Sequence, residues 1–411
     1  MFEARDYLLP SMKKSDSKFL ENIYEVGGNS PNRIGAMEGL RGFAVVLVFF
    51  VHYHSLFAGS LPKDSISYNI SKFLEVNGNS GVDLFFVLSG YLIYGAVIKN
   101  YDFLKFIYRR IQRVYPAFLV VFAIYLLASM LVPEKSKIPH ETSSAAIYIL
   151  QNLLLLPGMF KIEPLITVAW SLSYEFFFYL FLPLLVASVQ LQKQKPRLRV
   201  VFFIALSILC ISYSFFGAFS NLKLVMFASG ILVYEAVKNF RLHEKTTWKF
   251  DIFALLLLFN ALPLTFFLLE SPEKLYLTNY PHLTNVFHLI LLFVTFFVLV
   301  LGCIGSKTLL KMIFSWTPLR WLGNMSYSYY LIHGFTLQCL AFVLLKIAPQ
   351  TIETSFGFWA FMIISFTLTW ISSTILFVAV EKPFSLDNSS KVSAKETVSA
   401  PKFAKIIENE Q

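Results

Sequence analysis

The sequence predicts an all-α, polytopic membrane protein with about ten transmembrane helices. Of its 411 residues, 56% are hydrophobic and only 15% are charged, whereas soluble globular domains are nearer a quarter charged. The mean hydropathy is +0.62. The apolar residues come in blocks of roughly 20, which is the length that a bilayer requires. These observations exclude a soluble α/β enzyme, a disordered chain and a disulfide-stapled secreted module.

Ten apolar segments account for the predicted transmembrane helices, in windows of about 19 residues. They lie near 37–57, 82–98, 114–132, 168–188, 200–217, 222–238, 251–270, 284–304, 326–346 and 357–380. The weakest is 222–238, which is short and carries Glu235. An eleventh run, 145–159, contains Pro157 near its end and is short for a span, so it suits a re-entrant or interfacial piece.

The distribution of basic residues predicts the topology. With ten spans and the N-terminus inside, 27 of the 35 Lys and Arg residues fall on the inner side, so the positive-inside rule places both termini in the cytoplasm. We expect 1–36 to be a polar cytoplasmic segment without the apolar core of a signal peptide. Residues 37–384 form the predicted membrane domain, and 385–411 a disordered cytoplasmic tail. The three cysteines lie in apolar runs and are expected to be small core residues.

The first predicted span is the richest in ionisable residues, with Glu38, Arg41, His52 and His54. Arg41 and His52 are about three helical turns apart, so they share one face and lie about 16 Å apart along the axis. Charges at membrane depth are costly, which favours a functional role for His52. The alternatives are that Arg41 is a snorkelling anchor and that His52 is a hydrogen-bonded packing residue.

A second group of polar residues lies between 83 and 113. Asp83 is expected near the outer end of its helix as an N-terminal cap, and Ser89-Gly90 makes a small surface for close helix packing or a thin ligand. Arg110 and Arg113 are neighbours on a helical turn and could clamp phosphate groups. The alternative for this pair is a topology signal that attracts anionic lipids.

Two later spans also carry buried ionisable residues. Glu175 follows Trp170 in an aromatic segment, so it must be protonated, paired or facing a polar cavity. An ion pair with the first span is the structural alternative. His333 is intramembrane and is as consistent with packing as with function, and we interpret His288 as structural. The sequence contains no glycine-rich phosphate loop, HExxH motif or Cys/His metal set, and no metal is predicted.

With these residues together, the chain resembles the acyltransferase 3 family of integral membrane enzymes. Six motifs in the family's order carry the resemblance: Glu38-Gly39-Leu40-Arg41 with His52, Gly81-Val82-Asp83-Leu84-Phe85-Phe86 with Ser89-Gly90, Arg110-x-x-Arg113-x-Tyr115-Pro116, Trp170-x-Leu172-x-x-Glu175-x-x-x-Tyr179, Gly323-x-x-Ser326-Tyr327-x-x-Tyr330-Leu331-x-His333 and Glu381-Lys382-Pro383-Phe384. Many relatives carry Asp at the position of Glu38, and the carboxylate is kept here.

The resemblance implies a role for each of these residues. His52 would be catalytic, with Arg41 and Glu175 in the same site. Acyl-CoA would be held by Arg110, Arg113, Tyr115 and Ser89. The substrate pocket would include Glu38, Asp83, Trp170, Tyr327 and His333. Some members of the family carry a periplasmic hydrolase-like domain after the last span, and this chain would be the standalone form.

The function that the resemblance implies is transfer of an acyl group, expected to be acetyl, from cytosolic acetyl-CoA to a hydroxyl of a cell-envelope carbohydrate. O-antigen of lipopolysaccharide or another lipid-linked saccharide is the expected acceptor, and a bacterial inner membrane the expected location. His52 would act as a general base or as a transient acyl carrier. Membrane lipids are expected partners and nucleic acid is not.

Two other functions fit the same sequence. A proton-coupled secondary transporter or flippase would also use buried His and Glu residues, but it would not need the Arg110 and Arg113 pair. A catalytically inactive receptor on the same scaffold is disfavoured by the presence of Arg41 and His52.

Overall fold

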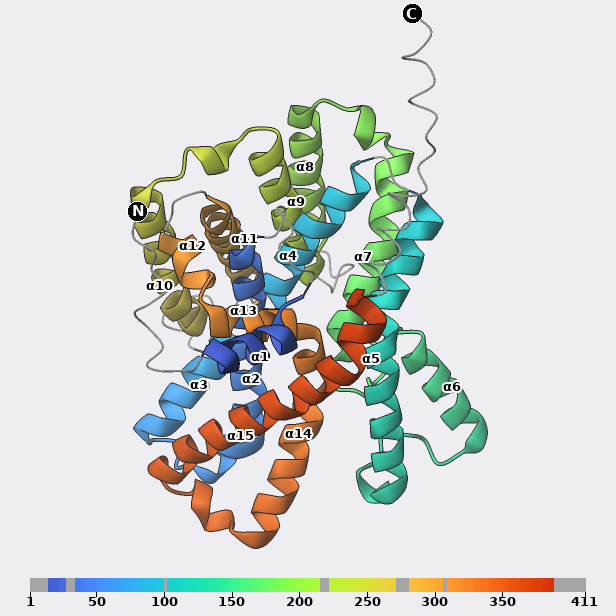
Figure 1. Ribbon diagram of the computed structural model, residues 1–411, viewed down its shortest axis with the longest axis vertical. Coiled ribbons are helices and arrows are strands. Elements are labelled where there is room, and N and C mark those ends of the chain that lie inside the picture. Colours follow the sequence, from blue (N-terminus) through green and yellow to red (C-terminus); the bar gives the residue numbers. More distant parts are fainter. Residues whose placement is uncertain are drawn as a thin grey trace, which may run out of the picture.

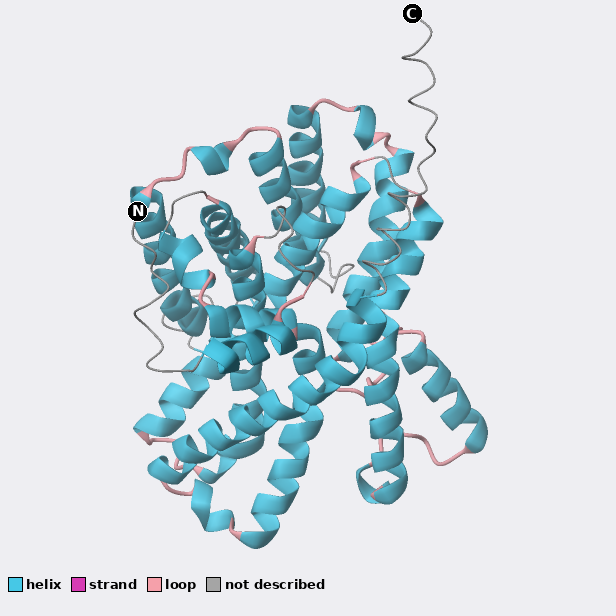
Figure 2. Cartoon of the chain, in the orientation of Figure 1, coloured by secondary structure: helices cyan, strands magenta, loops and turns pink. Residues whose placement is uncertain are grey.

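The computed structural model describes residues 14–26, 34–99, 102–214, 222–270, 281–305 and 309–387. Throughout these ranges the secondary structure is helical and no strand is present (Figure 2), which confirms the predicted all-α fold. The helices are α1 (Lys14–Tyr24), α2 (Gly35–Phe57), α3 (Ile66–Gly78), α4 (Ser80–Val97), α5 (Phe103–Leu131), α6 (Thr142–Leu153), α7 (Ala169–Ser188), α8 (Pro196–Ser214), α9 (Val225–Lys238), α10 (Trp248–Glu270), α11 (Pro281–Ile304), α12 (Leu309–Phe314), α13 (Thr317–Asn324), α14 (Ser326–Ile347) and α15 (Ser355–Leu376), followed by a π-helix, η8 (Phe377–Asp387).

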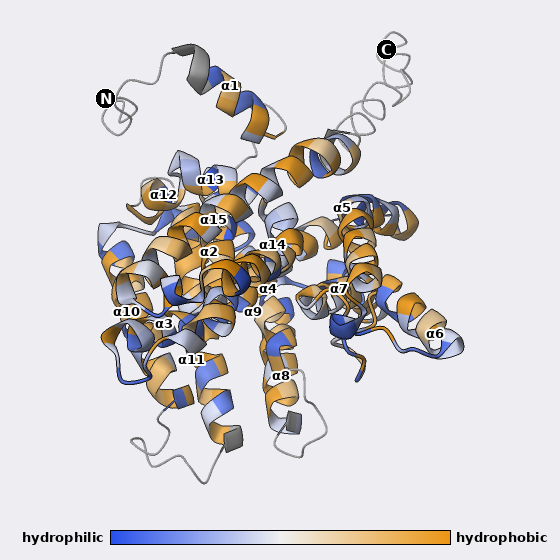
Figure 3. Ribbon diagram, turned by 90° about the horizontal axis from the view of Figure 1, so that it is seen from below, coloured by the Kyte–Doolittle hydropathy of each residue, from blue (hydrophilic) through white to orange (hydrophobic). Residues whose placement is uncertain are grey.

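Nine helical segments of the described chain are long and apolar enough to cross a membrane. Orange, the colour of hydrophobic residues, predominates along the helices in Figure 3. The exception among the ten predicted spans is 222–238, where α9 has only 14 residues and is about 21 Å long. It packs against α4, α8 and α11, and most of its residues are buried. The weakest predicted span is therefore a short internal helix.

The second span begins earlier than the sequence indicates. Helices α3 and α4 follow each other directly and together form one helical segment, Ile66–Val97. Asp83 lies in the first turn of α4, about 25 Å along this segment from Ile66. The prediction that Asp83 lies near the outer end is wrong, because α3 extends the segment beyond it. Lys72 and Glu75 make α3 too polar for hydropathy to detect.

The run 145–159 does not form a long helix. Its helix, α6, has 12 residues and is about 18 Å long, well below the roughly 30 Å of a hydrocarbon core. This length agrees with the prediction that the run does not span. The side of the membrane on which each terminus lies stays a prediction, and residues 1–13, 27–33 and 388–411 of the predicted cytoplasmic segments lie outside the described residues.

The three cysteines occupy different environments. Cys303 is buried, Cys210 is half-buried and Cys339 is exposed, and all three are free thiols. The expectation of a core position is therefore wrong for Cys339, whose helix α14 turns that side away from the protein interior.

Helix α2 lies in the middle of the bundle, where α3, α4, α13 and α14 pack around it (Figure 1). Its first turns are tied to α13 by an ion pair between Glu38 Oε2 and Arg320 Nε at 3.1 Å, and Arg320 also binds Glu25 at 3.0 Å. Helices α5, α6 and α7 lie on one side of the bundle and α10 to α12 on the other (Figure 1). The arrangement places α2 and α14 side by side along the residues that the sequence marks as functional.

Helices α4 and α9 cross at their glycines. A Cβ on Gly90 would lie 2.1 Å from the carbonyl oxygen of Phe227, and one on Gly230 would lie 1.9 Å from that of Val87. No side chain fits there, because real Cβ contacts do not come below 3.0 Å. The predicted small surface at Ser89-Gly90 is thus used for helix packing.

We expect Gly230→Ala to separate α4 from α9, because the added methyl meets backbone that cannot rotate away. Overpacking of this kind typically costs about 1–3 kcal/mol. The melting temperature of the purified protein in detergent should fall by several degrees. Gly59→Ala is the matched control, because nothing lies within 4 Å of a Cβ at that position. Equal melting temperatures for the two variants would contradict the close crossing.

Candidate active site

Helices α2, α4, α5, α7 and α14 meet around a cavity of about 110 Å³. Pockets for drug-sized ligands are about 300–1,000 Å³, so this cavity admits only a narrow part of a larger substrate. Its polar lining residues are Arg41, Ser89, Arg110, Arg113, Ser171, Glu175, Tyr179, Ser326, Tyr327 and Tyr330. Six of the residues singled out in the sequence are therefore brought together: Arg41, Ser89, Arg110, Arg113, Glu175 and Tyr327.

Glu175 is held in the cavity wall by two hydroxyl donors. Ser89 Oγ donates to Glu175 Oε1 at 2.8 Å, and Tyr179 Oη donates to the same oxygen. Tyr179 lies one turn after Glu175 on α7, so the pair is a local (i, i+4) contact. These two bonds fix the position of the Glu175 carboxyl group in the cavity wall.

Arg110 packs between two aromatic rings. Its guanidinium carbon lies 5.2 Å from the ring centre of Phe106 and 5.6 Å from that of Tyr179. Within the described residues, its buried Nε has no hydrogen-bond partner. Cation–π contacts fix the side chain without using its N–H donors, so the Nε–H is available to a ligand.

Arg113 is engaged differently, because it forms an ion pair with Glu381 from η8. Arg113 Nη1 lies 2.8 Å from Glu381 Oε1, and the Glu381 side chain is fully buried. The other carboxylate oxygen accepts hydrogen bonds from the backbone N–H of Ser328, at 3.0 Å, and from its hydroxyl. The sequence marked Glu381 only as part of a motif and assigned it no role. Its partner Arg113 could not be identified from spacing, because the two are at opposite ends of the membrane domain.

Arg41 completes the charged lining from the α2 side. Its Nε donates to Ser326 Oγ at 3.1 Å, at the start of α14. The three guanidinium groups of Arg41, Arg110 and Arg113 exceed the two carboxylates of Glu175 and Glu381 by one charge. The cavity is therefore suited to an anionic ligand.

His52 and His333 form a close pair between α2 and α14. Their ring centres are 4.8 Å apart, and His333 is completely buried. His333 Nδ1 lies 2.7 Å from the carbonyl oxygen of Tyr330, so Nδ1 must carry the proton and Nε2 the lone pair. No described residue hydrogen-bonds His333 Nε2. Since Tyr330 lines the cavity, His333 contacts the cavity wall and His52 contacts His333.

The contacts of α2 confirm that Arg41 and His52 share one face. Arg41 binds Ser326 and His52 packs on His333, and both of these partners lie on α14. Arg41 and His52 are about 16 Å apart along α2. Helix α14 therefore follows this face of α2 from one site residue to the other.

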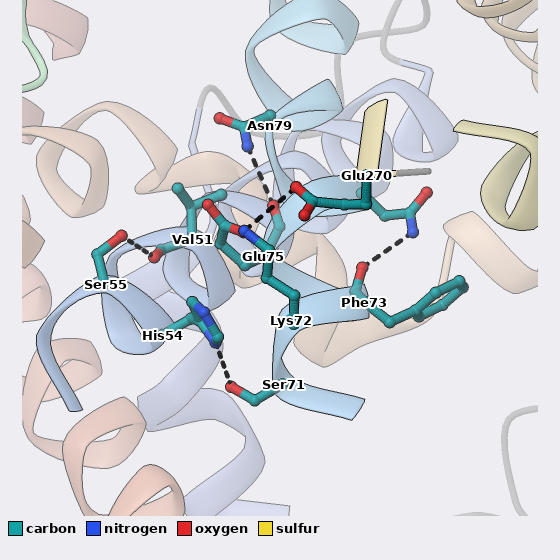
Figure 4. Close-up of polar contacts among 10 residues, drawn as sticks. Val51, His54, Ser55, Ser71, Lys72, Phe73, Glu75, Asn79 and Glu270 are labelled. Carbon is teal, nitrogen blue, oxygen red and sulfur yellow. Dashed lines mark hydrogen bonds and ion pairs between the residues drawn. The ribbon is translucent and has the colours of Figure 1, made fainter. Parts of the chain in front are cut away.

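His54 points away from this pair, toward α3 (Figure 4). Its Nδ1 lies 2.9 Å from Ser71 Oγ. Nearby, Lys72 bridges Glu75 at 3.0 Å and Glu270 at 3.2 Å, which ties the end of α10 to α3 (Figure 4). The second histidine of α2 thus belongs to a polar contact between helices.

Other residues marked in the sequence lie outside the first cavity. The hydroxyl of Tyr115 donates to the Leu153 carbonyl at 3.3 Å, toward α6, and Glu38 binds Arg320. Asp83 and Trp170 line a second cavity of about 360 Å³. The predicted substrate residues are therefore divided between two cavities, the His52–His333 pair and the α2–α13 contact.

Four polar lining residues were not among the predicted site residues: Ser171, Tyr179, Ser326 and Tyr330. Tyr330 Oη shares a hydrogen bond with Ser171 Oγ at 2.6 Å and joins α14 to α7. Three of the four stand at fixed positions in the motifs quoted above, which was the available signal. Ser171 lies between two such positions and carried none.

The sequence is similar to those of known O-acetyltransferases. The chain is 28% identical over 352 residues to the O-acetyltransferase OatA of Staphylococcus aureus strain NCTC 8325 / PS 47, which covers 78% of this chain and 53% of that protein. The OatA proteins of strains COL and MRSA252 match to the same extent. The chain thus spans about half the length of these relatives. No solved structure matches it.

Residues 34–377 match the family described as "Acyltransferase domain". All residues that line the first cavity fall within this range. Glu381, the ion-pair partner of Arg113, lies just beyond it. With a family match over most of its length and nine apolar helices in its described part, the chain belongs to the acyltransferase 3 family of membrane enzymes.

Proposed function

We propose that this protein transfers an acetyl group from acetyl-CoA to a hydroxyl of a cell-envelope carbohydrate. The observation that carries the proposal is the cavity in which Arg41, Arg110 and Arg113 converge, together with the His52–His333 pair about 16 Å further along the same face of α2. An acyl-CoA enzyme requires an anion-binding group for the donor and an imidazole within reach of the donor's extended arm. A proton-coupled carrier has no use for three arginines in one cavity.

The donor fits the charge and the size of the first cavity. Acyl-CoA is an anionic molecule with a narrow pantetheine arm that ends in the thioester. Arg110 presents an Nε–H without a partner among the described residues, and the cavity volume of about 110 Å³ suits a narrow chain. In this proposal the arginines hold anionic and polar groups of the donor while the thioester end extends along the α2–α14 contact toward His52.

The chemistry requires a base next to the thioester. A neutral imidazole at His52 takes the proton of the acceptor hydroxyl as its oxygen attacks the thioester carbonyl carbon. The C–S bond breaks, and the imidazolium returns the proton to the departing thiolate, which gives an ester and free CoA thiol. In the alternative route, His52 first accepts the acyl group and the hydroxyl then removes it.

His333 would position His52 in either route. Its Nδ1–H is committed to the Tyr330 carbonyl, so its Nε2 can only accept a hydrogen bond. An N–H of the His52 ring, 4.8 Å away between ring centres, would donate such a bond after a small rotation. Such a bond would fix which nitrogen of His52 faces the substrate.

We expect His52→Ala to lower acetyl transfer by about 10²–10⁴-fold, the usual effect of losing a general base, with little change in melting temperature. Transfer is measured with radiolabelled acetyl-CoA in membranes of equal protein content. His54→Ala is the matched control, since His54 faces α3, and it should retain most activity. Turnover of His52→Ala within twofold of wild type would remove His52 from the mechanism.

The two arginines of α5 should respond differently to substitution. Arg110→Ala should weaken acetyl-CoA binding about ten- to hundredfold, as expected for a charge-assisted hydrogen bond worth roughly 1.5–3 kcal/mol, without loss of stability. Arg113→Ala should also destabilise the fold, because it leaves Glu381 buried without its cation, at a cost of about 3–5 kcal/mol. Calorimetric titration and thermal melting separate the two effects.

The double variant Arg113→Ala/Glu381→Gln serves as the control for this comparison. Removing the buried charge should restore the melting temperature but not the affinity for acetyl-CoA. If the double variant binds acetyl-CoA as wild type does, Arg113 has only a structural role.

The predicted topology leads to a further expectation about the two substrates. In sealed vesicles of known orientation, acetyl-CoA supplied on the cytoplasmic side should label a glycan supplied on the opposite side, because the basic residues of α5 belong to the predicted inner side and His52 lies about 16 Å further along α2 than Arg41. Labelling that needs both substrates on the cytoplasmic side would show that the glycan is modified before export.

A further inference from the structure

We propose that the second cavity is the binding site for the carbohydrate acceptor. The inference rests on the proposed function and adds to it a place for the second substrate. The cavity has a volume of about 360 Å³, which lies within the range typical of small-ligand sites. It is lined by Asp83, Trp170, Tyr174, Leu222, Lys223, Asn285, His288, Leu289 and Leu292.

The lining comes from the N-terminal halves of several helices. Asp83 lies at the start of α4, Trp170 at the start of α7 and Asn285 near the start of α11, while Lys223 lies in the short turn η4 (Leu222–Leu224) before α9. Asn285 is exposed and lies at the rim. In the predicted topology α7 and α11 begin on the outer side, where an envelope carbohydrate would approach, and Asp83, about 25 Å along its helical segment from Ile66, lies deeper.

Two buried polar atoms of this cavity lack partners within the described residues. Asp83 is 3% exposed. Its Oδ2 accepts a hydrogen bond from Lys223 Nζ at 3.3 Å, but its Oδ1 has no partner. His288 Nε2 is likewise buried and unpartnered. A buried polar atom without a hydrogen bond costs roughly 1–3 kcal/mol, so both atoms are suited to bonding with hydroxyl groups of a ligand.

An indole side chain supplies the apolar part of the site. Trp170 lines the cavity and packs edge-on against Tyr174, with 5.6 Å between ring centres. The ammonium group of Lys223 lies 5.8 Å from the centre of the Trp170 ring. A sugar ring has an apolar C–H face and a rim of hydroxyls, so it can pack on the indole while its rim bonds the carboxylate, the imidazole and the ammonium group.

The charges of the cavity favour a neutral polyhydroxylated ligand over a phosphate. Lys223 is the only cation among the lining residues of the described chain, and the Asp83 carboxylate neutralises it at 3.3 Å. The first cavity, by contrast, has an excess of guanidinium groups. The charge of the first cavity therefore suits an anionic donor, and the neutral second cavity suits a neutral acceptor.

The two cavities share a wall. Phe86 lines the first and Tyr174 the second, and their ring centres are 6.0 Å apart. On α7, Trp170 lines the second cavity while the next residue, Ser171, lines the first. A saccharide on Trp170 is thus separated from the proposed donor site by one layer of side chains.

The test measures binding of two neutral probes, N-acetylglucosamine tetrasaccharide and maltotetraose, to the purified full chain. We expect wild-type protein to bind one of them saturably, and Trp170→Ala and His288→Gln to weaken that binding at least tenfold while acetyl-CoA affinity stays within twofold. Trp248→Ala and Lys249→Met are matched controls. They change an indole–ammonium pair with the same 5.8 Å spacing at the start of α10, outside both cavities, and should bind as wild type does.

The outcomes separate this inference from the proposed function. Failure of both tetrasaccharides to bind, or equal binding by the Trp170 and Trp248 variants, overturns the saccharide site even if acetyl-CoA is bound and turned over. Inorganic phosphate that competes with the bound tetrasaccharide would also overturn it. Saccharide binding that depends on Trp170, in a protein that binds no acetyl-CoA, would keep the site and refute the donor.

Discussion

The buried ion pair between Arg113 and Glu381 is the contact on which the shape of the first cavity depends. It joins α5 to the π-helix η8, and Ser328 extends it to α14. A buried carboxylate that loses its cation is strongly destabilising, so the last helical segment must return to the bundle for α5 to keep its register. Helices of π type are rare and often occur at functional sites, and here the π-helix carries the carboxylate that fixes an arginine of the cavity.

The same contact explains why two neighbouring arginines differ in their freedom to bind a ligand. Arg113 forms an ion pair with Glu381, whereas Arg110 packs against aromatic rings and has a buried N–H without a partner among the described residues. Glu175, fixed by Ser89 and Tyr179, balances part of the remaining charge. The arginines outnumber the carboxylates, which favours binding of an anion. The carboxylates offset part of the repulsion between the arginines.

The sequence predicted what depends on periodicity and composition. The shared face of Arg41 and His52 follows from helical geometry alone, and both residues contact α14. Contacts between distant segments were beyond reach: nothing in the spacing pairs His52 with His333, or Arg113 with Glu381. Hydropathy also missed α3, whose Lys72 pairs with Glu75 of the same helix and with Glu270 of α10. Asp83 was therefore placed at a helix end that the fold moves about 25 Å away.

Helix α2 links the two halves of the proposed reaction. Arg41 lies at the first cavity and His52 about 16 Å further along the same face, and α14 covers the interval. A donor held by its anionic end at the arginines must therefore be extended for its reactive end to meet His52. Only a long, narrow arm satisfies this geometry, and a compact donor such as acetyl phosphate would reach the arginines or the imidazole but not both. The separation of charge from base along one helix thus favours a carrier-bound acyl group, and the second cavity on the far side of α4 and α7 leaves the acceptor a separate approach.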